Sequence, residues 1–171
     1  MSYFRAPWST SLIVTSVFAS LLCIGASYTM RSVPAGELQP VLSLISVLPF
    51  GIIVISTLFI IRGYVLTYDA LLVKRLLWTT RLPLAGLESA AVDPDAMRRS
   101  IRLFGNGGFF SFTGYFRNQR LGTYRALVTN PRQTIVLRYP QNTVVVSPDR
   151  PEEFVVALQN FRDTLQARGV R

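Results

Sequence analysis

The sequence predicts an α+β protein in which a two-helix transmembrane hairpin precedes a small antiparallel β-barrel or sandwich that one C-terminal α-helix closes. Two long apolar segments near the N-terminus contain no charged residue. After residue 61, short runs of β-branched and aromatic residues alternate with turn residues, which is typical of strands. Beyond residue 148 the apolar residues recur at helical spacing. We therefore expect a membrane anchor over residues 1–62 and one domain over residues 63–171.

The predicted spans are residues 12–30 and 41–61. At ~1.5 Å per residue these helices are ~28 and ~31 Å long, close to the ~30 Å hydrocarbon core of a bilayer. The first span is diluted by Ser and Thr, so a cleaved signal peptide is the alternative. We favour a span, because the preceding residues contain only Arg5 and no small-residue cleavage site follows. Pro49 and Gly51 predict a kink in the second span.

The basic residues near the span ends predict the orientation. The connector between the spans carries only Arg31 and Glu37, so it is nearly neutral. Four basic residues follow the second span closely: Arg62, Lys74, Arg75 and Arg81. Since basic residues stay on the cytoplasmic side, we expect a protein integral to the cytoplasmic (inner) membrane with both termini cytoplasmic.

Short strands are expected to follow the second span directly. The segment "YVLTYDALLVKRL" predicts a hairpin around residues 68–70, and "RLPL" and "LESAAV" read as short edge strands. The run "MRRSIRLFG" alternates as a strand does. The runs "GTYRALVT" and "TIVLRY", joined by residues 130–132, predict a second hairpin, and "TVVVS" is the last strand.

The C-terminal helix is expected over residues 150–168. Asp149 is the expected N-cap, acidic residues follow in the first turn, and Arg168 precedes Gly169 at the end. Its apolar residues at helical spacing are Phe154, Leu158, Phe161 and Leu165.

The order of the segments "GGFFSFTGYF", "LGTYRALVT", "TIVLRY" and "VVVSPDRPEEFVVAL" resembles that of the bacterial pleckstrin-homology-like (PH-like) domains found behind a pair of transmembrane helices. The resemblance covers residues 63–158 and implies a PH-like barrel of two roughly orthogonal sheets with a C-terminal helix. It implies no defined ligand. Eukaryotic PH domains often bind phosphoinositides through basic residues in the first hairpin loop, but here that loop is Tyr68, Asp69 and Ala70, so this site does not carry over.

The composition argues against an enzyme. The chain has no histidine, and its one cysteine, Cys23, lies within the first span. This removes the Ser-His nucleophile, the usual zinc sites and any intramolecular disulfide. The acidic pairs at residues 93/95 and 152/153 suit a turn and a helix N-terminus. We therefore expect no catalytic residue, no cofactor and no metal.

The charge distribution points to anionic lipid headgroups as the nearest partner. The net charge is +9, and residues 62–171 hold 16 of the 18 basic and 8 of the 9 acidic residues. A basic domain held against the cytoplasmic leaflet gains ~1 kcal/mol for each well-placed basic side chain. The predicted lipid-facing residues, which include a tyrosine of the interface belt, are Arg62, Tyr64, Lys74, Arg75 and Arg81.

The stretch "GNGGFFSFTGYF" forms a second candidate patch with the arginines around it. It lacks the ending of a P-loop and departs from the dinucleotide fingerprint. Either its glycines make a tight turn and its aromatics enter the core, which we favour, or the aromatics insert into the membrane while the arginines bind phosphate. The candidate residues are Arg98, Arg99, Arg102, Phe109, Phe110, Arg117 and Arg120.

These observations predict a membrane-anchored, non-enzymatic binding or scaffolding module that binds a protein partner or an anionic lipid surface. Self-association and β-strand addition at an exposed sheet edge are also expected. The alternative is an accessory subunit of a membrane transporter or envelope enzyme complex. Basic and aromatic residues suit nucleic acid as well, but membrane tethering restricts access and no such motif occurs, so we expect no nucleic-acid partner.

Overall fold

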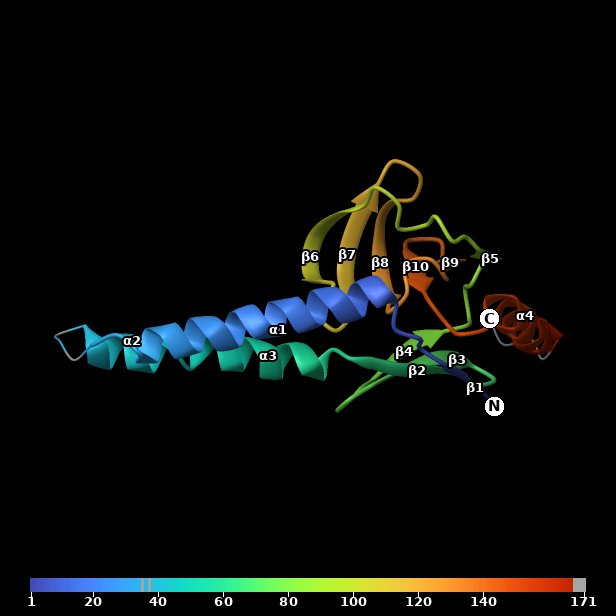
Figure 1. Ribbon diagram of the computed structural model, residues 1–171. Helices are drawn as coiled ribbons and strands as arrows, with labels where there is room; N and C mark the ends of the chain where they lie inside the picture. The colour runs from blue at the N-terminus through green and yellow to red at the C-terminus, as the bar shows by residue number, and fades with distance from the viewer. Residues whose placement is uncertain (35, 37, 168–171) are drawn as a thin grey trace.

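The computed structural model describes residues 1–34, 36 and 38–167, which form a helical hairpin and two β-sheets (Figure 1). The hairpin comprises α1 (Thr10–Arg31), α2 (Gln39–Ile45) and α3 (Leu48–Leu58). It extends away from the sheets, while the N-terminus and α4 (Pro151–Ala167) lie at the opposite end of the molecule (Figure 1). Glu37, Arg168 and Gly169, which entered the sequence analysis, lie outside the described residues.

The helical hairpin packs α1 against α2 and α3. Ser9 caps α1, because its hydroxyl accepts a hydrogen bond from the amide of Leu12 at 3.2 Å. The second arm is interrupted between Ile45 and Leu48. Pro49 cannot donate an amide hydrogen bond and its ring crowds the carbonyl of Ile45, four residues earlier. The predicted kink is therefore present, one turn before the proline that causes it.

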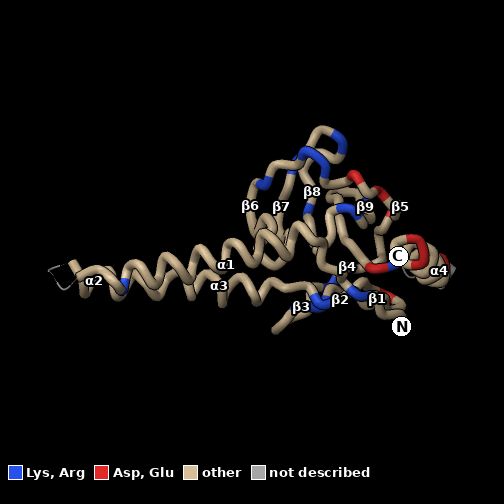
Figure 2. The backbone as a smooth tube through the Cα atoms, in the orientation of Figure 1, with Lys and Arg blue, Asp and Glu red and all other residues tan. Residues whose placement is uncertain are grey.

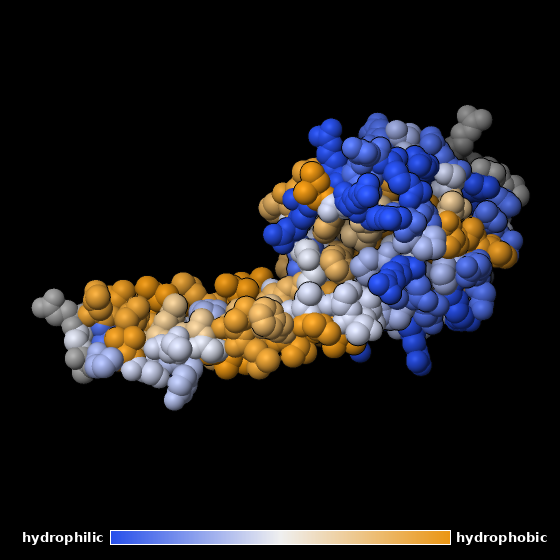
Figure 3. Space-filling view, turned by 45° about the horizontal axis from the view of Figure 1, so that its top comes forward, coloured by the Kyte–Doolittle hydropathy of each residue, from blue (hydrophilic) through white to orange (hydrophobic). Residues whose placement is uncertain are grey.

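Both arms of the hairpin, Thr10–Arg31 and Gln39–Leu58, are long and apolar enough to cross a membrane. Only 17% and 6% of the residues in their most apolar windows are buried, whereas the core helix of a soluble protein is mostly buried. Figure 2 shows charged residues gathered on the sheets and loops, and Figure 3 shows a hydrophobic surface along most of the hairpin. The hairpin thus presents apolar side chains to its surroundings.

The first sheet has four antiparallel strands in the order β1 (Ser2–Arg5), β2 (Ile61–Leu66), β3 (Ala70–Arg75), β4 (Thr79–Pro83). The β2–β3 hairpin is the one that the sequence predicts, whereas β1 was not predicted. Phe4 pairs with Tyr64, and a Cβ on Gly63 would come within 2.6 Å of the Tyr3 hydroxyl, so glycine permits the close approach of β1. Since β1 precedes α1 and β2 follows α3, both ends of the helical hairpin return to one sheet.

The second sheet has six strands in the order β5, β9, β10, β8, β7, β6. Their bounds are β5 (Ser89–Val92), β6 (Ile101–Gly107), β7 (Phe112–Asn118), β8 (Gly122–Val128), β9 (Ile135–Arg138) and β10 (Thr143–Val146). The predicted β8–β9 hairpin is wrong, because β10 lies between these strands and runs parallel to β8. The connection at residues 129–134 is a wide loop with its own hydrogen bonds, such as Asn130 Nδ2 to Gln133 Oε1 at 3.0 Å. This width leaves room for β10.

The two sheets pack face to face but do not close into a barrel, which corrects the barrel expectation. Within the described residues no strand pairing joins the sheets, so β1 and β4 remain edges of the first sheet and β5 and β6 edges of the second. The core between the sheets includes Leu71 and Val73 of the first and Leu127 and Leu137 of the second. A smaller cluster around Phe116 covers the other face of the six-stranded sheet. Mutual burial of apolar side chains, not a continuous ladder, holds the sheets together.

The helix α4 covers one end of the core. Phe154 and Leu158 are buried as predicted, and Phe161 is partly buried; nothing is described of the Leu165 side chain. Because the helix begins at Pro151, Asp149 is not its N-cap. The Asp149 carboxylate instead accepts a hydrogen bond from the amide of Arg5 at 3.1 Å, which ties β1 to the start of α4.

Candidate binding surfaces

The outer face of the four-stranded sheet carries some of the residues that were predicted to face lipid. Arg5 and Lys74 both pair with Gly63, so their side chains share the outer face. Arg81 forms an exposed ion pair with Asp69, which reduces the free charge here. Arg5 was not among the predicted lipid-facing residues, because only the pairing of β1 with β2 brings it to this surface. The exposed or half-buried basic residues are Arg5, Arg62, Lys74 and Arg81.

Tyr64 does not face lipid, which corrects the expectation of an interface tyrosine. Its side chain is completely buried, and its hydroxyl donates to the Leu127 carbonyl at 2.7 Å and accepts from the Ser147 amide at 3.1 Å. Burial raises the pKa of Tyr64 to about 12. The side chain joins the two sheets, because Tyr64 lies in β2 and both partners belong to the β8–β10 region.

Arg75 is also buried, so it is not available to a headgroup as predicted. Its guanidinium group donates to the Phe59 carbonyl at 3.2 Å and to the Thr80 hydroxyl at 3.3 Å. It lies 5.8 Å from the ring of Phe59 and 5.7 Å from that of Trp78, within cation–π range. Burial lowers the pKa of Arg75, and the nearby Arg125 lowers it further. Arg75 therefore fastens the β3–β4 hairpin to the end of α3.

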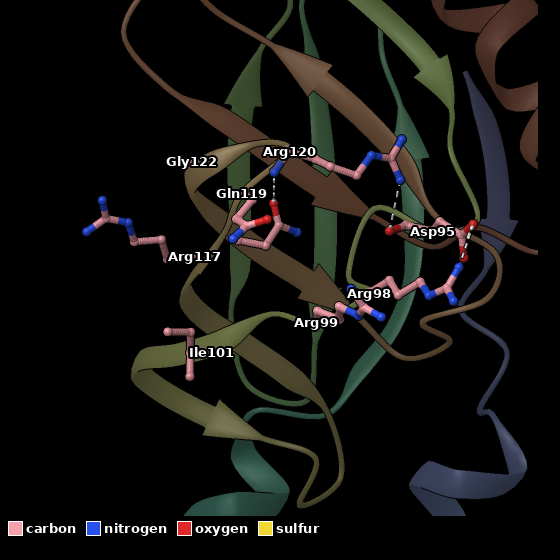
Figure 4. Close-up of a pocket in the computed structure, with 9 residues that line it drawn as sticks. Asp95, Arg98, Arg99, Ile101, Arg117, Gln119, Arg120 and Gly122 are labelled. Atoms are coloured by element: carbon pink, nitrogen blue, oxygen red, sulfur yellow. Dashed lines mark hydrogen bonds and ion pairs between the residues drawn. The ribbon is translucent and has the colours of Figure 1, made fainter.

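Four arginines of the second predicted set line one cavity of about 790 Å³ (Figure 4). The cavity lies between the 95–101 segment and the β7–β8 turn. We call it the arginine pocket, and its other lining residues are Asp95, Ile101, Asn118, Gln119 and Gly122. The arginines are Arg98, Arg99, Arg117 and Arg120.

Asn118 positions the two walls of the arginine pocket. Its buried side-chain amide donates to the Ala96 carbonyl at 2.8 Å and to the Ser100 hydroxyl at 2.9 Å. Its side-chain oxygen accepts from the amides of Arg120 and Leu121 at 3.0 and 2.8 Å. One side chain therefore fixes the loop carrying two of the arginines against the turn carrying the third. These hydrogen bonds therefore hold the two walls of the pocket in a defined position.

The four arginines differ in how far they are neutralised. Arg120 contacts the carboxylate of Asp93 at 2.9 Å, and Arg98 lies 3.9 Å from that of Asp95. Within the described part of the chain, Arg99 and Arg117 make no side-chain hydrogen bond or ion pair. Arg99 also has a φ of 53°, a conformation uncommon for residues other than glycine. Arg99 and Arg117 are therefore the unpaired basic groups at this cavity, and an unpaired guanidinium group suits a phosphate or another anion. Figure 4 shows the Arg117 side chain directed away from the other three arginines.

The other residues of the second candidate patch do not line the arginine pocket. Arg102 hydrogen-bonds the Gly105 carbonyl at 3.3 Å and lines a neighbouring hollow. Phe109 and Phe110 stack on each other at 4.5 Å, and the amide of Phe110 donates to the Ser16 hydroxyl at 2.9 Å. These phenylalanines therefore dock the β6–β7 turn onto the first turns of α1.

The glycine-rich segment is a structural turn, in line with the favoured interpretation, but its aromatics do not share one environment. Gly105 and Gly114 face each other across β6 and β7, both with positive φ. Phe116 is buried in the smaller cluster, whereas Phe104 and Tyr115 are 77% and 50% exposed. Only part of this segment contributes to the core.

The described residues contain no group of three or more His, Cys, Asp or Glu that could hold a metal ion. The chemistry that the surfaces offer is recognition of anions by arginine and lysine.

The comparison with known proteins agrees with this architecture. A family model for the bacterial PH domain matches residues 62–161, which is more than half of the chain. No curated protein and no solved structure is similar enough to count as a match. PH domains are generally non-catalytic modules that bind proteins or lipids. The chain belongs to the bacterial PH domain family.

Proposed function

We propose that this protein is a membrane-anchored, non-enzymatic binding module whose helical hairpin crosses the cytoplasmic membrane and whose PH-like domain binds anionic headgroups at the inner leaflet. The observation that carries the proposal is an exposed apolar hairpin fused without a linker to a basic domain. Phe59 and Ile60 alone separate α3 from β2.

The pairing of β1 with β2 supports an uncleaved first span. A signal peptide is removed from the mature chain, and its removal here would take β1 from the four-stranded sheet. It would also remove Arg5, whose backbone hydrogen-bonds the Asp149 carboxylate. Since both ends of the hairpin meet in one sheet, two crossings keep the N-terminus and the domain on the same side.

The charge distribution supports a cytoplasmic domain. On α1, α2 and α3 the one charged residue in the described part is Arg31, at the end farthest from the sheets. The domain holds the other basic groups, including Lys74 and Arg81 close to the second span. This asymmetry follows the positive-inside rule.

The arginine pocket is the proposed headgroup site. Arg99 and Arg117 would each contact headgroup phosphates directly, and Asn118 would hold the loop of Arg99 against the β7–β8 turn. Each basic group near an anionic surface contributes ~1 kcal/mol, so two direct contacts give a weak, salt-sensitive affinity that the anchor supplements by raising the local concentration.

The test is a titration of the full-length protein in mild detergent with a short-chain, water-soluble anionic phospholipid. A zwitterionic phospholipid of the same chain length and inorganic phosphate serve as comparisons. We expect saturable binding of the anionic lipid that the double variant Arg99→Gln/Arg117→Gln loses. Arg132→Gln removes an exposed arginine outside the pocket and is the matched control. Equal binding by both variants would exclude the pocket as the headgroup site.

A protein partner is the second candidate, and the open edge of β6 favours it. Every residue of β6 but Asn106 is exposed, and its outer edge pairs with no strand of the described residues. Such an edge accepts a partner strand. Co-purification from native membranes distinguishes the alternatives: a stoichiometric second polypeptide indicates an accessory subunit of a transporter or envelope enzyme. A second copy of the chain indicates a homo-oligomer.

A further inference from the structure

The turn between β3 and β4 consists of residues that turns in water seldom contain. The amide of Arg75 donates to the Trp78 carbonyl at 2.9 Å, so Leu76 and Leu77 occupy the two central positions of a tight turn. Gly, Pro, Asn, Asp and Ser dominate such positions. We call residues 76–78 the hairpin tip.

The hairpin tip exposes its apolar side chains. Leu76, Leu77 and Trp78 are 45%, 72% and 39% exposed. Among the nearby basic residues, Lys74 is half-buried on the outer face, Arg75 is buried beneath the tip and Arg81 is paired with Asp69. An exposed apolar tip next to basic side chains is the pattern of a segment that enters the membrane interface.

The structure holds the hairpin tip beside the end of the helical hairpin. The ring of Trp78 packs edge-on against that of Phe59, the residue after α3, at a centroid distance of 5.4 Å. The guanidinium group of Arg75 lies near both rings and bonds the Phe59 carbonyl. Figure 1 shows the β3–β4 hairpin reaching from the sheet to the level where α3 ends. The tip therefore lies at the depth where the chain would leave the bilayer, and tryptophan is enriched at that depth.

We propose that the hairpin tip inserts into the boundary between headgroups and acyl chains of the leaflet that faces the domain. This inference rests on the proposed function, because it requires the helical hairpin to span the membrane. It adds a third membrane contact to the two spans. The β6–β7 turn and Arg75 already hold the domain against the two helices, and this third, off-axis contact would add lipid contact on the side of the domain where the tip lies.

The experiment compares three single-tryptophan versions of the full-length chain in bilayers containing acyl-chain-brominated phospholipids. Trp8→Phe leaves Trp78 as the reporter of the hairpin tip. Adding Trp78→Phe and Phe18→Trp reports the exposed surface of α1, and adding Trp78→Phe and Val156→Trp instead reports α4, at the end of the domain remote from the hairpin. Brominated chains quench only nearby tryptophans, and aqueous iodide quenches those exposed to water.

The expected result is quenching by brominated lipid at residues 18 and 78, with residue 78 at the shallower depth, and quenching by iodide alone at residue 156. If residue 18 is quenched by brominated lipid but residue 78 responds to iodide, the inference is wrong and the proposed function stands. If residue 18 also escapes the brominated lipid, the proposed function fails. Trp78 shielded from both quenchers would overturn the inference too, because the tip would then be buried against a second copy of the chain.

A second pair of variants tests the cause of insertion without moving the reporter. Leu76→Ser/Leu77→Ser removes the apolar surface of the tip but keeps Trp78 and its contact with Phe59. We expect this change to shift the balance between inserted and withdrawn tip by about ten-fold toward the withdrawn state. Val156→Ser removes an equally exposed apolar side chain from α4 and leaves Trp78 quenching unchanged. Unchanged quenching in the double leucine variant would contradict the proposal.

Discussion

The hydroxyl group of Tyr64 gives the sharpest test of how the two sheets are joined. It donates to the Leu127 carbonyl and accepts from the Ser147 amide, both buried. Tyr64→Phe keeps the ring, which packs edge-on near Phe154 at 6.3 Å, and removes only the oxygen. Any loss of stability therefore reports the hydrogen bonds between the sheets and not a cavity.

The expected loss follows from the two backbone groups left without their partner. Each unsatisfied buried donor or acceptor costs roughly 1–3 kcal/mol, so the free energy of unfolding should fall by about 2–6 kcal/mol. For a domain of about 100 residues this lowers Tm by on the order of 10–25 °C. The sheets would separate more easily because no backbone ladder joins them within the described residues.

The assay is thermal unfolding of the full-length protein in detergent micelles, followed by near-ultraviolet circular dichroism, which reports tertiary packing of the domain. Tyr3→Phe is the matched control, because the Tyr3 hydroxyl bonds the Arg62 carbonyl at 3.2 Å at an exposed position. The control should change the free energy of unfolding by less than about 0.5 kcal/mol. Equal, small shifts for both variants would refute the claim that Tyr64 bridges the sheets.

Three further changes test the fold and the pocket. Burial raises the pKa of Tyr64 from an ordinary value of 10 to about 12, so the folded state holds this proton more tightly than the unfolded state does. The resulting contribution to the free energy of unfolding is complete below pH 10 and is lost as the pH rises toward 12. Alkaline unfolding of the wild type and of Tyr64→Phe measures this loss. Gly114→Ala should cost about 1–3 kcal/mol, since its φ is 137° and a Cβ would collide with the Phe104 carbonyl; Gly86→Ala, also at positive φ but facing open space, should cost only about 1 kcal/mol in the same unfolding assay. Asn118→Ala should lower stability by roughly 2–4 kcal/mol and weaken binding of the anionic lipid in the titration, because its four hydrogen bonds hold the arginine pocket together; full affinity in a folded variant would show that the pocket does not bind the headgroup.

The sequence predicts those features that depend on neighbouring residues. The apolar helices, the β2–β3 hairpin and α4 each follow from composition or spacing over a short window. Thr67 illustrates this: its hydroxyl accepts from the amide of Ala70 and donates to the carbonyl, which closes the predicted turn. Such features survive in the structure because local hydrogen bonds and local apolar periodicity determine them.

Features that depend on distant pairing escaped the sequence analysis. No local pattern marks residues 2–5 as a strand, because β1 forms only against β2 on the far side of the helical hairpin. This strand also bears on Tyr64 and Val65, consecutive residues that are both buried: Tyr64 faces the core, and Val65 lies on the outer face directly opposite Tyr3 of β1. The placement of β10 between β8 and β9 likewise depends on the parallel pairing of β10 with β8, which passes over β9 in the sequence and which no local pattern marks.

The arginines show which structural roles could be predicted from the sequence and which could not. Strict alternation along β3 places Arg75 on the same face as Leu71 and Val73, so its burial could have been inferred from the pattern. The arginine pocket could be predicted only as a list of flanking residues. What holds the 96–100 loop against the β7–β8 turn is Asn118, whose side chain at the end of β7 bonds both.

The most direct test of the central claim is the topology of the helical hairpin. In a Cys23→Ser background, Gly36→Cys places one thiol in the connector and Arg132→Cys places one in the exposed β8–β9 loop. The account predicts that a membrane-impermeant maleimide added to intact cells labels residue 36, whereas residue 132 is labelled only after the inner membrane is permeabilised. Labelling of residue 132 in intact cells, or of neither position until permeabilisation, would contradict a hairpin that crosses the membrane and holds the PH-like domain in the cytoplasm.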